Sequence, residues 1–205
     1  KKDVTAYLKK IGHMPLPPYI RRDDEPSDRE DYQTVYAKNL GSVAAPTAGL
    51  HFTKGLLKKL KASGHRFGKV TLHVNYGTFR PVQEADIRNH QMHHEEYAMT
   101  KVVANMIQKI KEAKQKIIGV GTTSCRVLET YARTGELGGS TNLFVYPGFS
   151  FKAVDILLTN FHLPKSTLLM LVCAFAETSL VMRAYEEAIK EKYRFYSYGD
   201  CMLII

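Results

Sequence analysis

The feature of this sequence that most limits its fold is a regular alternation of short apolar runs and helical segments from residue 42 onward. The expected strands are Val43 and residues 70–74, 117–120, 143–146, 156–158 and 201–205. The expected helices are residues 53–62, 100–113, 124–133, 166–177 and 179–192. Because strands that alternate with helices form parallel sheets with crossover helices, we predict an α/β fold, either a barrel or an open sheet.

The first 41 residues follow a different pattern. Residues 1–11 have the apolar spacing of a helix, and the prolines at positions 15, 17 and 18 favour an extended linker. Residues 22–30 are densely charged and are expected to form a surface loop, before a short helix within residues 31–38. We expect residues 1–205 to form one domain, in which residues 1–41 hold a helix, a proline-rich linker and a short helix, and residues 42–205 hold the alternating elements.

The composition excludes several classes of protein. Of the 205 residues, 44% are hydrophobic and 24% are charged, so the chain can bury a core and is not disordered as a whole. The longest apolar stretch, residues 168–176, is too short to span a bilayer, and we expect no contact with a membrane. The three cysteines are widely spaced and form no CxxC pair, which indicates reduced thiols and a cytoplasmic protein.

The charge balance favours a polyanionic partner. The chain has 29 Lys and Arg against 20 Asp and Glu, which gives a net charge of +9 at pH 7. Such an excess favours nucleic acid through the release of its counterions. Residues 193–200 interleave aromatic side chains with a cation, an arrangement that stacks on exposed bases but that a buried aromatic strand uses equally well.

The loops that follow the expected strands concentrate small, hydroxyl-bearing, histidine and arginine residues. In α/β folds the functional loops lie past the carboxyl ends of the strands. The run Gly121-Thr122-Thr123-Ser124 comes where a strand leads into a helix, so it can bind an anion, a ribose diol or a carboxylate at the positive end of the helix dipole. A plain helix N-cap is an equal alternative. Arg126, one turn into the helix, can reach the same ligand.

Three histidines lie in or beside three different loops of this set. His51, His73 and His162 are each candidates for a general base or acid near neutral pH. A single histidine on a strand, as expected for His73, is more often a hydrogen-bonded structural residue. The grouping of three histidines by loop position is therefore the stronger signal.

A second histidine group, His90, His93 and His94 with Glu95 and Glu96, has the residue types of a metal site. The group lacks a companion cysteine and the HExxH signature, and its surroundings are polar enough for a solvated surface. We therefore expect no metal.

Long, uncommon strings of residues carry a resemblance to a known family. The most specific strings are Ala-Pro-Thr-Ala-Gly-Leu-His-Phe at residues 45–52 and Thr-Asn-Phe-His-Leu-Pro-Lys-Ser at residues 159–166. Further matching strings lie at residues 12–20, 32–37, 70–82, 120–126, 146–148 and 193–203. Together they run essentially from end to end, and the chain closely resembles the S-adenosylmethionine:tRNA ribosyltransferase-isomerases of the queuosine pathway.

The resemblance implies a specific reaction and a specific fold. A member of this family moves the ribosyl part of S-adenosylmethionine onto 7-aminomethyl-7-deazaguanine at the wobble position of tRNA. The ribose is rearranged, epoxyqueuosine tRNA forms, and adenine and methionine leave. The family fold is an α/β-barrel-like domain with a small inserted β-barrel domain. Residues 1–205 correspond to the stretch after that insertion, so we expect an incomplete barrel-like catalytic domain without the small domain, acting as a monomer.

The resemblance also suggests roles for particular residues. A base must remove the ribose C5′ proton that the sulfonium makes acidic, and His51, His73 and His162 are the candidates. Groups that bind the ribose diol and the methionine tail are Thr47, Thr122, Thr123, Ser124 and Asn160, with Arg126 as the carboxylate partner and Pro147 and Gly148 from the Tyr-Pro-Gly motif. Candidates for phosphate contacts with tRNA are Arg80, Lys165 and Arg194. S-adenosylmethionine is the co-substrate, and the scheme requires no metal. Asn75 stands where the family motif has Gly.

Two other functions remain open from the residues alone. The chain could be a non-catalytic RNA-binding module, in which the basic charge and the aromatic residues matter and the loops are structural. It could instead be another α/β-barrel enzyme that acts on a nucleotide or sugar phosphate without RNA. Release of free adenine separates the first from the proposed enzyme, and turnover of the small molecule alone indicates the second.

Overall fold

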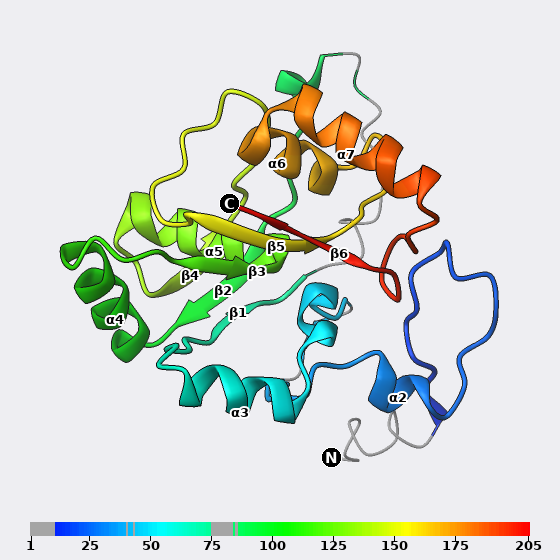
Figure 1. Ribbon diagram of the computed structural model, residues 1–205, viewed down its shortest axis with the longest axis horizontal. Helices are drawn as coiled ribbons and strands as arrows, with labels where there is room; N and C mark the ends of the chain where they lie inside the picture. Colours follow the sequence, from blue (N-terminus) through cyan, green and yellow to red (C-terminus); the bar gives the residue numbers. More distant parts are fainter. Residues whose placement is uncertain (1–10, 40, 43, 75–83, 85) are drawn as a thin grey trace, which may run out of the picture.

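Two small sheets and a set of helices make up the fold (Figure 1). The computed structural model describes residues 11–39, 41, 42, 44–74, 84 and 86–205. The first sheet is antiparallel, with the strand order β1-β2-β4. Its strands are β1 (Val70–Leu72), β2 (Glu95–Met99) and β4 (Gly138–Thr141).

The second sheet has the order β3-β5-β6 and holds the parallel pair of the fold. Its strands are β3 (Ile118–Val120), β5 (Ile156–Asn160) and β6 (Cys201–Ile204). Strands β3 and β5 are parallel, with Gly119 opposite Leu157, whereas β6 is antiparallel to β5. Asn160 therefore ends the central strand of this sheet, beside the start of β6.

Three of the helices begin at hydroxyl-bearing caps. The helices are α2 (Asp28–Asp31), η1 (Thr47–His51), α3 (Lys54–Ala62), η3 (Ile87–Asn89), α4 (Lys101–Glu112), α5 (Gly121–Thr134), α6 (Thr167–Ala176) and α7 (Thr178–Lys190). Side chains of Thr53, Thr100 and Ser166 each accept a hydrogen bond from the backbone N–H three residues later, and so start α3, α4 and α6. All five helices expected after residue 52 are present, and α5 begins three residues earlier than expected.

The prediction of a mixed α/β fold is confirmed, but several strand predictions are wrong. Two strands, β2 and β4, were not expected, and residues 143–146 form no strand. In β2 the buried positions include the charged Glu95, which breaks the apolar pattern that marks a strand, and β4 is the polar run Gly-Gly-Ser-Thr. The first sheet is antiparallel and the second contains one parallel and one antiparallel pair, whereas the alternation predicted parallel sheets. The short helix lies at Asp28–Asp31 rather than within residues 31–38. Val43 and residues 1–10 lie outside the described residues.

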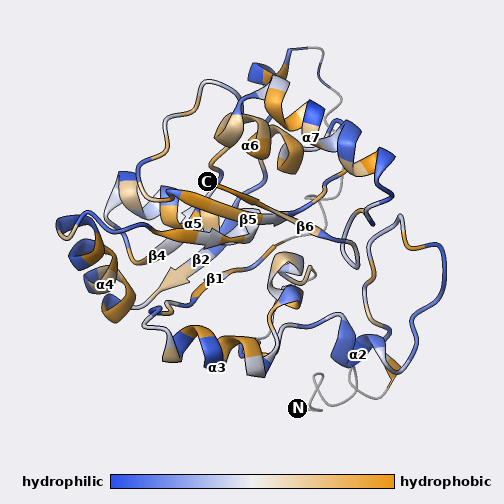
Figure 2. Ribbon diagram, in the orientation of Figure 1, coloured by the Kyte–Doolittle hydropathy of each residue, from blue (hydrophilic) through white to orange (hydrophobic). Residues whose placement is uncertain are grey.

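Helix α5 connects the two sheets and anchors the core. It contacts β1 of the first sheet and both β3 and β5 of the second. Its fully buried residues include Cys125 and Val127, both 0% exposed. In Figure 2 the apolar colouring is concentrated on β5, on β6 and on α6, which covers the second sheet. Within the described part of the chain, no single helix is long and apolar enough to cross a membrane; α6 and α7 pass that test only together, with a bend of 113° between them.

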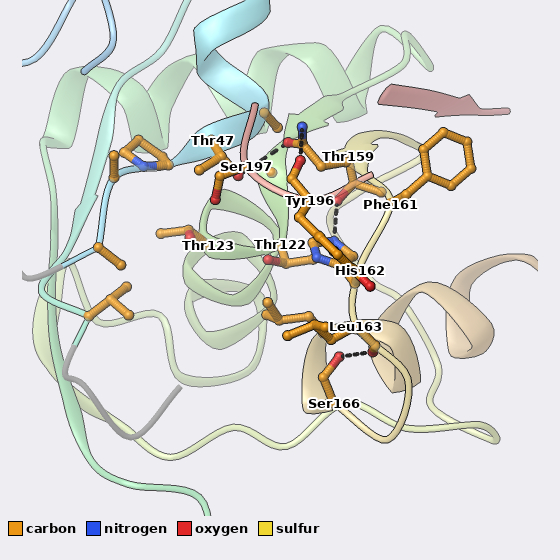
Figure 3. Close-up of a pocket in the computed structure, with 18 of the residues that line it drawn as sticks. Thr47, Thr122, Thr123, Thr159, Phe161, His162, Leu163, Ser166, Tyr196 and Ser197 are labelled. Atoms are coloured by element: carbon orange, nitrogen blue, oxygen red, sulfur yellow. Dashed lines mark hydrogen bonds between the residues drawn. The ribbon is translucent and has the colours of Figure 1, made fainter. Parts of the chain in front are cut away.

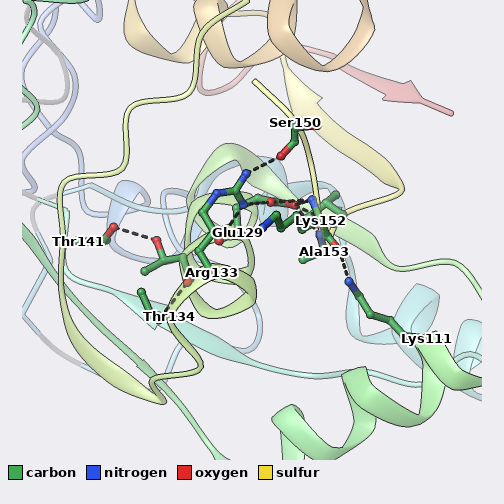
Figure 4. A network of polar contacts seen from close by, with 10 residues as sticks. Lys111, Glu129, Arg133, Thr134, Thr141, Ser150, Lys152 and Ala153 are labelled. Carbon is green, nitrogen blue, oxygen red and sulfur yellow. Dashed lines mark hydrogen bonds and ion pairs between the residues drawn. The ribbon is translucent and has the colours of Figure 1, made fainter. Parts of the chain in front are cut away.

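A buried carboxylate on α5 holds the segment that leads into β5 (Figure 4). Glu129 is 0% exposed and accepts hydrogen bonds from the backbone N–H groups of Lys152, Ala153 and Val154 at 2.8–3.1 Å. The guanidinium of Arg133 pairs with the same carboxylate and donates to the backbone oxygen of Ser150. This network therefore fixes the segment that leads into β5.

The N-terminal segment packs against the turn before β6 (Figure 1). The rings of Tyr19 and Tyr196 lie 4.8 Å apart, and those of Tyr32 and Tyr198 lie 5.5 Å apart. The phenol of Tyr198 donates to the buried carboxylate of Asp28 at 2.7 Å. Bonds from Arg22, from the Glu25 amide and from this phenol lower the pKa of Asp28 well below its usual range. Segments some 170 residues apart in sequence thus pack against each other.

Candidate functional site

An open cavity lies where four parts of the chain meet (Figure 3). Its empty volume is about 780 Å³, a figure that includes the solvent at its mouth. One wall is the segment from Ala44 to Ala48, and a second is the N-terminus of α5 from Gly121 to Thr123. The end of β5 and the following loop, from Thr159 to Leu163, form the third. Aromatic and hydroxyl side chains from the N-terminal segment and the turn before β6 form the fourth: Tyr19, Tyr32, Tyr196 and Ser197.

Asn160 joins three of these walls. Its side-chain oxygen accepts a hydrogen bond from the hydroxyl of Thr47 at 3.2 Å, and its amide nitrogen lies 3.2 Å from Nε2 of His51. The same nitrogen donates to the backbone oxygen of Tyr196 at 3.2 Å. Because Asn160 is 2% exposed, these bonds are made out of contact with bulk water. Asn160 is therefore the central positioning group of the site.

His162 is a neutral histidine in the wall of the cavity. Burial lowers its pKa to about 4. The Nε2 atom lies 2.7 Å from the hydroxyl of Thr159, and its backbone N–H donates to the phenol of Tyr185 at 2.8 Å. With this pKa the imidazole is neutral near pH 7. It can therefore act as an acceptor for a proton on a group that lies within hydrogen-bonding distance.

His51 does not line the cavity but lies directly behind it. It ends η1, and its Nε2 meets the Asn160 amide, which makes that nitrogen an acceptor and puts the ring proton on Nδ1. Desolvation lowers the pKa of His51, and the nearby charge of Arg194 lowers it further, although Asp200 opposes both. The 3₁₀ turn that carries Thr47 and His51 approaches Tyr36 so closely at Gly49 that a Cβ there would lie 2.1 Å from the phenol oxygen.

The N-terminus of α5 faces the cavity without a side-chain cap. Its N-cap residue is Val120, which makes no capping hydrogen bond, and Gly121 adopts a φ of +85° to start the helix. Thr122 and Thr123 therefore lie inside the first turn, and the alternative of a simple Thr or Ser cap is wrong. The first amides of a helix and its dipole attract an anion. Thr122 and Thr123 both line the cavity, whereas Ser124 does not.

Hydroxyl groups join the aromatic side of the cavity. The phenol of Tyr19 and the hydroxyl of Ser197 lie 2.5 Å apart, and the phenol of Tyr32 lies 3.4 Å from the same hydroxyl. Ser197 is 5% exposed, and burial raises the pKa of Tyr32 to about 12. The tyrosines therefore stay protonated and act as neutral donors and as flat apolar surfaces.

Arg126, predicted as the carboxylate partner, is not among the residues that line the cavity. Its side chain is buried at 5% exposure, where Nη1 pairs with the carboxylate of Glu95 and Nε donates to the backbone oxygen of Leu143 at 3.1 Å. The reason is its helical position, because Arg126 lies on the face of α5 that meets the first sheet. The guanidinium thus links α5 to β2.

The other predicted residues divide into neighbours of the cavity and residues remote from it. Thr47, Thr122, Thr123, Asn160 and His162 line it. Lys165 is exposed beside it, between the lining residues Leu163 and Ser166, with a φ of +57°. Arg194 is exposed and pairs with Asp200 at 3.3 Å.

Three further predicted residues do not line the cavity. The backbone N–H of His73 donates to the Glu96 oxygen beside β1, and Pro147 and Gly148 form an exposed turn. Arg80 and Asn75 lie outside the described residues. Among the described residues, no three of His, Cys, Asp and Glu lie close enough together to hold a metal ion.

Sequence reasoning missed several cavity residues. Tyr19, Tyr32, Ser197, Thr159 and Ser166 line the cavity, but none was a predicted site residue. The signal was present, because all five fall within the strings that carry the family resemblance.

Comparisons with known proteins identify the family. Residues 1–204 match the family described as queuosine biosynthesis protein. The S-adenosylmethionine:tRNA ribosyltransferase-isomerase of Sulfurihydrogenibium sp. (strain YO3AOP1) is 56% identical over 204 residues, which cover 100% of this chain and 61% of that protein. The enzyme of the same name from Francisella philomiragia is 54% identical over 206 residues, covering 99% and 61%.

A solved structure agrees with these matches. The crystal structure of an S-adenosylmethionine tRNA ribosyltransferase from Thermotoga maritima superposes with a TM-score of 0.65 at 48% identity, covering 77% of this chain and 51% of that one. The present chain spans about three-fifths of the length of the curated relatives that it matches. The chain belongs to the queuosine biosynthesis protein family.

Proposed function

We propose that this chain carries the site at which the ribosyl part of S-adenosylmethionine is transferred to 7-aminomethyl-7-deazaguanine at the wobble position of tRNA and isomerised. The products are epoxyqueuosine tRNA, adenine and methionine. The observation that carries the proposal is the convergence of Thr47, Thr122, Thr123, Asn160 and His162 on one cavity, in a chain whose named relatives bear this activity.

His162 is the proposed base for the ribose C5′ proton. Its pKa of about 4 keeps the imidazole neutral at neutral pH, and the Thr159 hydroxyl holds the ring in one orientation. A proton made acidic by the adjacent sulfonium can be taken by a weak base that lies close to it in a site with little water. His51 supports the site from behind through Asn160 and is the second candidate.

The N-terminus of α5 is the proposed anchor for the methionine carboxylate. Uncapped amides and the helix dipole favour a carboxylate there, in the role first predicted for Arg126. The tyrosine rings that line the cavity suit a nucleobase by stacking and a sulfonium by cation–π attraction. Thr47 and Asn160 also line the cavity and can supply hydrogen-bonding partners to a ribose diol.

The tRNA would present its wobble base as an everted nucleotide. Anticodon-loop bases are unpaired, so their removal from the stack has a small energetic cost. Lys165, beside the cavity, and Arg194 are both exposed and are the proposed phosphate contacts, together with Arg80.

We further propose a setting for this site. The two sheets would belong to an α/β-barrel-like domain, and the part of the relatives that this chain does not match would include the family's small inserted β-barrel domain. The protein would act as a cytoplasmic monomer, without a metal. The structural match to the Thermotoga maritima enzyme supports the first of these statements.

One assay tests the proposed function. The protein is incubated with S-adenosylmethionine and tRNA that carries 7-aminomethyl-7-deazaguanine, and free adenine is measured by chromatography. We expect adenine in proportion to modified tRNA, and none when either substrate is left out. Tight tRNA binding without adenine would instead identify an RNA-binding module, and turnover without tRNA would identify an enzyme of small molecules.

A further inference from the structure

A strongly basic surface lies outside the cavity, on α3 and the segment that follows it. Residues 54–69 contain six cations and no Asp or Glu. All six are exposed: Lys54, Lys58, Lys59, Lys61, Arg66 and Lys69. We call this set the α3 basic surface. In Figure 1, α3 lies at the lower edge of the molecule, away from α7 at the top.

The arrangement of these lysines is unfavourable for the helix itself. Lys54, Lys58 and Lys61 are spaced i, i+4 and i+7, so they form one stripe along α3. Like charges at this spacing destabilise a helix by about 0.2–0.5 kcal/mol per pair. Lys54 also lies in the first turn, where the helix dipole disfavours a cation. Only Lys59 and Lys61, in the last turn, are favoured by that dipole.

Carboxylates do not compensate this charge. Some cations elsewhere in the described chain pair with acids, as Arg22 does with Asp28 and Lys190 with Glu187. Residues 54–69 take part in none of the ion pairs found among the described residues. Their cations lie instead against neutral groups: Lys61 is 5.9 Å from the centre of the Phe67 ring, and Arg66 donates to the Gln115 side chain at 2.8 Å.

The orientation of α3 favours nucleic acid over a lipid surface. A helix that lies in a membrane interface directs its apolar face outward. Here Leu57 and Leu60 are partly covered by the protein, and the lysines are exposed. Leu56 and Phe67 are also exposed, each at 39%, but they stand among six cations and form no continuous apolar face. A solvent-facing row of cations that is not paired with carboxylates can bind a phosphate backbone, because binding releases the ions condensed on the nucleic acid.

We propose that the α3 basic surface binds the phosphate backbone of tRNA outside the nucleotide that enters the cavity. The inference rests on the proposed function for the identity of the RNA. Helix α3 begins three residues after η1, whose Thr47 and Ala48 line the cavity, so a backbone held on α3 adjoins the site. The surface supplies affinity and orientation, and the cavity supplies the chemistry.

The test is a triple variant, Lys54→Gln/Lys58→Gln/Lys61→Gln, in the complete gene product. Gln has a helix propensity close to that of Lys, so the helix is kept. The matched control removes three exposed lysines elsewhere: Lys152→Gln/Lys190→Gln/Lys192→Gln. Binding of unmodified tRNA is measured by fluorescence anisotropy over a range of salt concentrations, separately from adenine release.

We expect the α3 variant to bind tRNA about tenfold more weakly or worse at 0.1 M salt, with a salt slope smaller by about 2. Its KM for tRNA should rise while kcat and the KM for S-adenosylmethionine stay unchanged. A salt slope and affinity equal to those of the control variant would overturn the inference. Loss of binding to vesicles of anionic lipid, with unchanged tRNA binding, would also overturn it.

The two proposals fail in different ways. If the unsubstituted protein binds tRNA but releases no adenine, the proposed function fails, and the binding data still decide the role of the α3 basic surface. Thermal unfolding checks the fold of the variant, which we expect to be at least as stable as the parent because the repulsion along α3 is relieved.

Discussion

The carboxylate of Glu129 offers a sharp test of how the fold holds its site. Substitution Glu129→Gln keeps the shape of the side chain but removes its charge and turns one oxygen into a donor. That donor would face the Lys152 amide or the Arg133 guanidinium, which now both donate to the carboxylate. Glu129→Ala removes every acceptor and leaves the Ala153 and Val154 amides buried without a partner.

The expected loss of stability follows from these bonds. A hydrogen bond to a charged group contributes about 1.5–3 kcal/mol, and a buried donor left without a partner costs about 1–3 kcal/mol. For Gln, one ion pair is lost and the backbone bonds become neutral, so we expect a loss of about 2–3 kcal/mol. For Ala, several donors are left unpaired together, and we expect about 3–5 kcal/mol. Against a total of about 5–15 kcal/mol, either loss is large.

Equilibrium unfolding in urea, followed by circular dichroism, measures both losses. The control is Glu136→Gln, an exposed glutamate just after the end of α5. We expect the control to unfold within about 0.5 kcal/mol of the parent, as surface substitutions usually do. If Glu129→Gln and Glu129→Ala also fall within that range, the carboxylate does not hold the segment before β5, and the reasoning from its hydrogen bonds is refuted.

Further predictions concern the cavity and its support. Arg126→Ala should lower stability by about 3–5 kcal/mol, because it breaks a buried ion pair by removing the guanidinium that faces the Glu95 carboxylate; an intact fold with weakened S-adenosylmethionine binding would restore its predicted ligand role. His162→Gln should abolish adenine release without loss of tRNA binding, and normal turnover would exclude it as the base. Because the pKa of His162 is about 4 in the folded protein and about 6.5 in the unfolded chain, its contribution to the free energy of unfolding is fully present above about pH 6.5 and is lost as pH falls toward about 4. Acid unfolding of the parent and of His162→Gln should therefore diverge in that window. Asn160→Ala should raise the KM for S-adenosylmethionine, since Thr47 loses its partner, and an unchanged KM would contradict this.

The local sequence was sufficient to predict the five α-helices after residue 52, although α5 begins three residues earlier than expected and the short N-terminal helix was misplaced. The expected helices at residues 53, 100 and 166 begin at the residues that cap α3, α4 and α6, and such a cap is a contact between residues only three apart. Strand β2 could not be predicted from the local sequence, because its buried Glu95 is stabilised by Arg126, a residue 31 positions later. A pattern confined to neighbouring residues cannot contain that partner.

The candidate site, like the fold, was predictable from the sequence only in part. The sequence alone determined which loops hold hydroxyl, histidine and amide groups, the excess of cations and the family resemblance, since all of these are properties of residue types in order. Only the tertiary structure decided that Thr47 and Asn160 bond to each other, that Arg126 is turned into the core, and that Tyr19 and Ser197 close the cavity. The physical reason is that burial, pKa and contact depend on what packs around a group, and in this fold the packing partners lie up to 178 residues apart along the chain.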